Sequence, residues 1–169
     1  MATSLVSTGV KFPDDSVQTT AATAAAVLQV KSITDTTQRS TTSGNLTNSG
    51  ISLSITPSST SSKILVLATF TWGGSTSITY PWFGLRRGTT DIGLGSGTSN
   101  KDCATAGSWE TSGTKLESGA MSFLDHPSTT SATTYHITFA RGGGYLYLNR
   151  MSTAAGDATT TLTLMEIAG

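Results

Sequence analysis

Apolar and polar residues alternate with a period of two along most of the chain after residue 26. Ile51, Leu53 and Ile55 alternate with serines, which is typical of a strand with one buried face. Residues 63–72 are apolar on both faces, so this strand is expected at the centre of a sandwich or at a subunit interface. The same pattern predicts further strands over residues 27–31, 80–87, 91–95, 117–124, 135–139, 145–150 and 159–167.

Short strands at this spacing are typical of a β-sandwich. We therefore predict an all-β, antiparallel, jelly-roll-like sandwich over residues 27–169, preceded by a short extended N-terminal arm, residues 1–26. Within the arm, the alanine-rich residues 19–26 predict either a short helix or the opening of the first strand. The residues expected in the core are Leu53, Ile55, Ile64, Val66, Phe70, Phe123, Ile137, Phe139, Leu162 and Leu164.

The arm contains a predicted turn at residues 13–16. Pro13 fixes its own φ and suits the second position of a turn. Val10, Phe12 and Val17 are isolated apolar residues in a polar segment that is too small to bury them by itself. We expect these side chains, together with Pro13, to anchor the arm on something outside it.

The segment GVKFPDDSVQTTAA, residues 9–22, resembles the G-x-x-F-P-D-G-T-x-Q-T-T-A-A segment of phage tail-fibre proteins, especially those of cyanobacterial and marine phages. Asp15 stands where those proteins usually have glycine. The runs LSITPSSTSSKILV (residues 53–66), FLDHPSTTSATTY (123–135) and TTLTLMEIAG (160–169) resemble their terminal β-sandwich domain. The resemblance therefore covers both ends of the chain.

This resemblance implies a structural protein of the virion, assembled in the host cytoplasm. It implies a short tail fibre whose arm docks to another virion protein, in the tail, baseplate or capsid, and whose β domain contacts a host-surface glycan or protein. The alternative is a capsid cement or decoration protein or a head fibre. Fibres of this class are homotrimers, and three arms around an axis would bury Val10, Phe12 and Val17 against one another. We therefore expect a homotrimer.

The composition narrows the possible partners. The net charge is zero and only 12% of the residues are charged, whereas binding of nucleic acid requires a basic face. No stretch approaches the ~20 apolar residues that a membrane-spanning helix needs, so membrane insertion is not expected. The single cysteine excludes a disulfide within the chain and fits assembly in a reducing compartment.

Residues that could support catalysis are few and scattered. His126 and His136 belong to no common motif, and Asp125, His126 and Ser128 are too close in sequence to supply the geometry of a catalytic triad. The sequence shows no histidine or cysteine spacing typical of a zinc site. We therefore expect neither an enzyme nor a metal or cofactor.

Aromatic residues near loops are the remaining candidates for a binding surface, because such rings supply a large contact area with few rotatable bonds. Residues 96–116 form a long polar segment, and loops of that length are often functional. The alternative for each ring is packing in the core or at a subunit interface. The candidates for receptor contact are Trp72, Tyr80, Trp82 and Trp109, with Tyr145 and Tyr147 as further exposed-loop aromatics.

Overall fold

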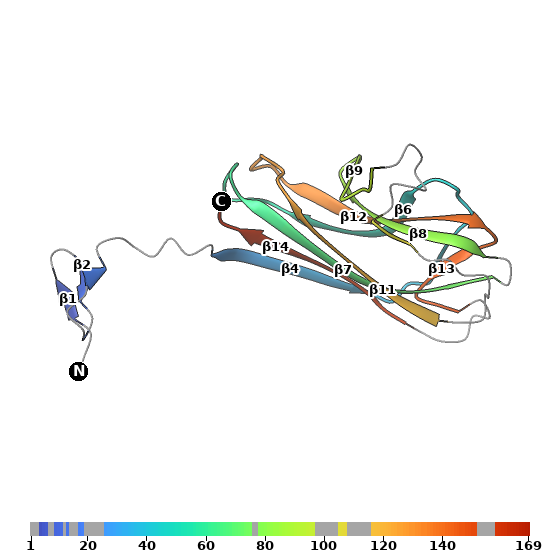
Figure 1. Cartoon of the computed structure of the whole chain (residues 1–169), viewed down its shortest axis with the longest axis horizontal. Helices are drawn as coiled ribbons and strands as arrows, with labels where there is room; N and C mark the ends of the chain where they lie inside the picture. The colour runs from blue at the N-terminus through green and yellow to red at the C-terminus, as the bar shows by residue number, and fades with distance from the viewer. Residues whose placement is uncertain are drawn as a thin grey trace.

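The computed structural model of the chain is all-β, and its described strands pair only antiparallel (Figure 1). Two sheets pack against each other and form the domain that we call the head, residues 27–169. The prediction of an all-β sandwich is confirmed. The structure describes residues 4–6, 9–11, 13, 17–18, 26–75, 78–96, 105–107, 116–151 and 158–169.

Sheet I of the head is organised around one long, apolar strand, β7, which pairs with β14 on one edge and β11 on the other. Beyond β14 lies β4, which forms the outer edge of the sheet. Near its C-terminal end β7 pairs with β13 instead, and β13 pairs with β5. The strands of sheet I are β4 (Val27–Asp35), β5 (Arg39–Thr41), β7 (Lys63–Gly74), β11 (Leu116–Asp125), β13 (Leu146–Leu148) and β14 (Thr160–Ile167).

Sheet II has β12 at its centre, paired with β6 on one side and β8 on the other. The short strands β9 and β10 both pair with the far edge of β8. The strands of sheet II are β6 (Thr47–Ile55), β8 (Thr79–Arg87), β9 (Thr90–Ile92), β10 (Ala106–Gly107) and β12 (Thr133–Gly143).

The long strands of the head alternate between the two sheets along the chain. Successive long strands β4, β6, β7, β8, β11, β12 and β14 alternate between sheets I and II, with β9 following β8 in sheet II. The resulting orders, β4-β14-β7-β11 and β9-β8-β12-β6, are those of a jelly roll built from two Greek keys. The topology that the sequence favoured is therefore the topology of the structure.

The core lies between the inner faces of the two sheets. Leu53 and Phe123 are partly buried and pack against it, while the other eight residues predicted for the core are buried. The alternation along β7 explains which of its residues are buried, since Ile64, Val66 and Ala68 face inward and their neighbours do not. Buried residues that were not among those expected in the core include Ile51, Ile78, Leu85, Met121, Tyr135, Leu146 and Leu148.

The side chain of Asn149 links the end of β13 to the start of β14, two strands that follow the same edge of β7. β13 ends at Leu148 and β14 begins at Thr160, and both run antiparallel to β7 along the same edge. Asn149 is fully buried with a φ of 60°, a conformation that asparagine tolerates better than most residues. Its Nδ2 donates to the backbone oxygen of Asp35 at 2.9 Å, and its Oδ1 accepts from Thr160 Oγ1 at 2.8 Å.

The N-terminal residues form a separate small sheet in the order β1-β2-β3. These strands are β1 (Ser4–Val6), β2 (Gly9–Lys11) and β3 (Val17–Gln18), and they pair only with one another. β2 and β3 therefore flank the segment in which the turn at residues 13–16 was predicted, and Pro13 lies in a turn. Residues 19–25, where a short helix was one alternative, lie outside the described residues.

Candidate functional site

Tyr80 and Trp82 form a stacked aromatic pair on the outer face of sheet II. Both lie on β8, where Pro81 and Phe83 are buried, so the alternation of the strand turns Tyr80 and Trp82 outward. Their ring centroids are 5.7 Å apart and their planes differ by 8°. The Tyr80 side of the pair is the more accessible, since that residue is 38% exposed.

The backbone around Tyr80 is shaped to hold this ring. Tyr80 has a φ of 49°, an uncommon value for a residue with a large side chain. Such strained conformations persist only where the surrounding structure imposes them, and they cluster at functional sites. Gly142 lies beside it on β12, and a Cβ there would be 2.7 Å from the Tyr80 ring and 3.1 Å from the Thr79 carbonyl oxygen. The ring therefore occupies space that only glycine leaves open.

A second aromatic pair, Tyr145 and Tyr147, lies on the outer face of sheet I. Leu146 and Leu148 point into the core, so the tyrosines on either side of Leu146 point outward. The two tyrosine rings are 6.1 Å apart with an interplanar angle of 6°. The Arg150 guanidinium lies 4.2 Å from the centre of the Tyr147 ring, within range of a cation–π interaction.

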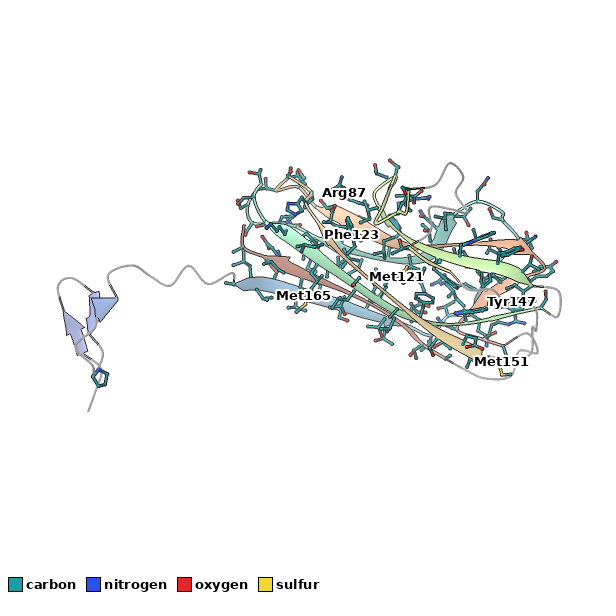
Figure 2. The ribbon with its side chains drawn as sticks, in the orientation of Figure 1. Arg87, Met121, Phe123, Tyr147, Met151 and Met165 are labelled. Atoms are coloured by element: carbon teal, nitrogen blue, oxygen red, sulfur yellow. The ribbon has the colours of Figure 1, made fainter. Side chains whose placement is uncertain are left out.

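Hydrogen bonds fix the second pair to the end of β7. Tyr145 N donates to Ser75 Oγ at 2.9 Å, and Ser75 N donates to the Tyr145 carbonyl at 3.0 Å. Both aromatic pairs belong to the end of the head opposite Val27, because the end of β7 at Gly74 pairs with Leu146 there and the start of β8 at Thr79 pairs with Gly143. Figure 2 labels Tyr147 toward this end and Met165 toward the other. We call the end at Val27 the near end and the aromatic end the far end.

The four candidate receptor residues do not form one cluster. Trp72 is only 5% exposed and its ring packs 5.9 Å from that of Phe83, with Phe83 and Phe70 also in contact. Trp72 lines a shallow depression of about 240 Å³ at the open edge between the sheets, next to Glu117. Its side chain therefore faces inward, whereas Tyr80 and Trp82 face outward. Trp109 lies outside the described residues.

Two of the four residues expected to anchor the arm, Val10 and Val17, fall in the small N-terminal sheet. Val10 is in β2 opposite Gln18, and Val17 is in β3 opposite Lys11. Pro13 is exposed in the turn, and Phe12 lies outside the described residues. The turn thus brings the strand carrying Val10 next to the strand carrying Val17.

The charged groups around Asp125 serve the fold. Arg87 Nη1 donates to both carboxylate oxygens of Asp125 at 2.9 and 3.0 Å, and Tyr135 Oη donates to Asp125 Oδ2 at 2.6 Å. Asp125 is therefore fully engaged, and His126 beside it is exposed in a loop. The carboxylate of Asp125 is therefore occupied by Arg87 and Tyr135 and does not orient His126.

In the described part of the chain, three titratable groups have shifted pKa values, each with a structural cause. Burial, followed by the hydrogen bond to Asp125, raises the pKa of Tyr135. Burial would raise the pKa of Glu166, but hydrogen bonds from Gln29 and Ser58 outweigh it and lower the pKa to about 2. Burial, and then the charge of Arg86, lowers the pKa of His136. Tyr135 and His136 are neighbours on β12 and therefore point to opposite faces of sheet II, and Glu166 lies on β14, so the three groups do not converge on one reactive centre.

Within the described residues, no group of three or more His, Cys, Asp or Glu side chains could hold a metal ion. The same part of the chain contains no helix that is long and apolar enough to cross a membrane. The stacked geometry of the two pairs suits contact with flat, partly apolar surfaces such as sugar rings, because exposed aromatic side chains present an apolar face beside a polar hydroxyl or N–H group. Arg150, which the sequence analysis did not single out, adds a charge to the second pair.

Comparison with known proteins adds no relative to this description. The chain matches none of the protein-family models and none of the curated proteins with which it was compared.

Proposed function

We propose that this chain is a structural protein of a phage particle, a short tail fibre that docks through its N-terminal arm and contacts the host surface with its head. The sequence from Gly9 to Ala22 supports this, because it resembles the segment found in phage tail fibres. That segment includes β2 and β3, which pair with no strand of the head among the described residues. A small unit joined to a larger domain is a suitable layout for a docking element.

The observation that carries the proposal is that the arm and the stacked aromatic pairs lie at opposite ends of the head. The arm joins the head at the near end, at Val27, while both stacked aromatic pairs belong to the far end. A fibre fixed to the particle at its near end would present the aromatic pairs outward. The proposed partners are a protein of the tail, baseplate or capsid at the arm, and a host glycan or protein at the far end.

The working unit in this proposal is a homotrimer. Three arms around one axis bring the Val10 and Val17 strands of the copies together, which gives these isolated apolar residues a place to be buried. Cyclic symmetry also closes the assembly, so that apolar surfaces do not continue into filaments.

The test is to locate the chain on intact particles of the virus that encodes it. Electron microscopy with a label on the head should place it on the tail or baseplate, and quantitative mass spectrometry should find tens of copies per particle. Hundreds of copies spread over the shell would support the capsid-decoration alternative instead. A variant lacking residues 1–22 should fold and yet be missing from purified particles; its incorporation at normal levels would contradict the docking role of the arm.

A further inference from the structure

The outer face of sheet I carries an apolar surface that the fold itself does not cover. On β14, Leu162, Leu164 and Glu166 are buried and point inward, so Met165 and Ile167 point outward. The same alternation on β7 turns Leu65 and Leu67 outward, away from the core. These outward residues contribute nothing to the packing between the sheets.

Strand register assembles these residues into a continuous row. Val30 on β4 pairs with Met165 on β14, Met165 pairs with Leu65 on β7, and Leu65 pairs with Leu124 on β11. The row therefore crosses four adjacent strands without a polar interruption. Both of its ends are open to solvent, since Val30 is 52% and Leu124 is 42% exposed.

The neighbouring rows on both sides extend this surface. At a β-bulge, Val27 and Leu28 both stand opposite Ile167, and both are exposed. On the other side of the row, Leu67 is exposed between Thr163 and Ser122. We call this surface the apolar face, and its members are Val27, Leu28, Val30, Leu65, Leu67, Leu124, Met165 and Ile167.

The outer face of sheet I is also almost uncharged. Beyond Leu67 it continues as a row of Thr34, Thr161, Thr69 and Ala120. Among the outward positions of these paired rows, Lys63 at the near end is the only charged residue. Sheet II differs, because Arg86 forms a 2.7 Å ion pair with Asp91 and lies beside His136.

We propose that the apolar face is the surface through which copies of this chain associate. A neutral face suits contact between identical copies, since each charge on it would meet the same charge or an apolar surface on the next copy. Contiguous exposed apolar patches on soluble proteins typically mark interaction sites. This inference deepens the proposed function, and it rests on that proposal only for the number of copies.

Two further features favour a second copy of this chain as the partner that covers the apolar face. β4 is the edge strand of sheet I, and its outer edge pairs with no strand among the described residues. An exposed apolar edge strand is prone to uncontrolled aggregation unless something covers it. The arm also enters the head at Val27, within the apolar face, so association here brings the starting points of several arms together. The contact between heads and the contact between arms then reinforce each other.

The test uses the full-length chain and a charge introduced at both open ends of the row. Val30→Glu combined with Leu124→Glu places carboxylates where a single chain is exposed, so the isolated head tolerates them. In the assembly the same carboxylates would be buried without a partner, which is strongly unfavourable. Leu94→Glu is the matched control, because Leu94 is 40% exposed and lies outside the apolar face.

Light scattering after size-exclusion chromatography should give a multiple of 17.4 kDa for the wild type and for Leu94→Glu. The double variant should have the mass of one chain and an unchanged circular dichroism spectrum. A folded double variant that keeps the multi-chain mass overturns the inference and leaves the homotrimer intact. A monomeric wild type overturns both, whereas virion localisation is decided separately on particles.

A second measurement needs no variant and therefore does not depend on the variant folding. Hydroxyl-radical footprinting should show Met165 protected in the associated wild-type protein and more reactive after dilution to single chains. Met151, labelled toward the far end in Figure 2, is the internal control and should react equally in both states. Equal reactivity of Met165 in both states would overturn the inference.

Discussion

Tyr135 donates a 2.6 Å hydrogen bond to Asp125 and so joins sheet II to sheet I across the buried interior. Arg87 binds the same carboxylate from β8. The two donors compensate for placing Asp125 out of contact with water, where an unpaired carboxylate would be costly.

Tyr135→Phe should destabilise the head, because it removes the hydroxyl and leaves Asp125 with Arg87 alone. A hydrogen bond to a charged group contributes about 1.5–3 kcal/mol, so we expect a loss of this size in the free energy of unfolding measured with urea. Tyr145→Phe is the control; Tyr145 is 51% exposed, and its substitution should cost less than about 0.5 kcal/mol. A loss at Tyr135 no larger than that of the control would contradict this role.

The alkaline stability of the head should also depend on Tyr135. Its pKa is raised in the folded state above the ordinary value of 10.0, so above that pH the unfolded chain loses a proton that the folded chain keeps. Stability is therefore lost as the pH rises beyond 10. The difference in unfolding free energy between wild type and Tyr135→Phe should shrink in this range, and a constant difference would count against the raised pKa.

Glu166 should make the head sensitive to acid. Its carboxylate accepts hydrogen bonds from Ser58 N and Ser58 Oγ at 2.7 Å and from Gln29 Nε2 at 2.6 Å. Its pKa is lowered from 4.5 to about 2. Its contribution to the free energy of unfolding is therefore complete above pH 4.5 and is lost as the pH falls toward 2.

The variant that tests this prediction is Glu166→Gln. It should be less stable than wild type by about 1–3 kcal/mol at pH 7, because an amide cannot accept from all of these donors. The difference should diminish below pH 4.5 in urea titrations. Gln29→Leu removes one donor and should show the same trend with a smaller amplitude. An unchanged difference down to pH 2 would exclude the proposed cause.

Gly142→Ala should disturb the Tyr80–Trp82 pair, since the new methyl group would lie 2.7 Å from the Tyr80 ring. Overpacking of this kind costs about 1–3 kcal/mol, and the displaced ring should change the tryptophan fluorescence and the near-ultraviolet circular dichroism. Gly44→Ala is the matched control, because its methyl group meets only the Arg141 carbonyl oxygen at 3.9 Å. Identical spectra for both variants would show that the ring has room elsewhere.

Binding to host cells should depend on the aromatic residues of the far end. Trp82→Ala and Tyr147→Ala should each weaken cell binding by the purified protein roughly tenfold, since an aromatic contact of about 1–2 kcal/mol is removed. Trp109→Ala is expected to do the same without lowering the melting temperature. Leu94→Ala, at an exposed position away from both pairs, should bind normally. Undiminished binding by all three aromatic variants would contradict this role of the far end and favour the capsid-decoration alternative.

The main strands were predictable because their alternation is local. Residues 51–55, 63–72 and 80–87 each lie within an observed strand. The apolar positions of 51–55 are buried or partly buried, and the strand over 63–72 lies inside its sheet, paired on both edges, as expected for a strand that is apolar on both faces. The short strands β5 and β10 were not predicted, since two or three polar or small residues carry no periodic signal. They are strands only because β13 and β8 offer them a paired edge.

The aromatic site was predictable only in part, for a related reason. Alternation places Tyr80 and Trp82 on one face, but their stacking depends on Gly142, which lies on another strand. The adjacent residues Arg86 and Arg87 point to opposite faces of β8 by alternation, and they pair with Asp91 and Asp125 respectively. Which carboxylate each arginine meets depends on how strands distant in sequence pack together.

Asn149 has a consequence for how this head could diversify. The backbone leaves the sheet at Asn149 and returns beside it, where Ala158 N donates to the Asn149 carbonyl at 3.3 Å. The intervening residues therefore begin and end at one closed point, and the cost of a longer loop grows only slowly with its length. Segments of different length and sequence could be exchanged there while the register of β13 and β14 stays the same. One buried amide thus fixes both ends of this connection to the scaffold, at the end of the head that carries the tyrosines.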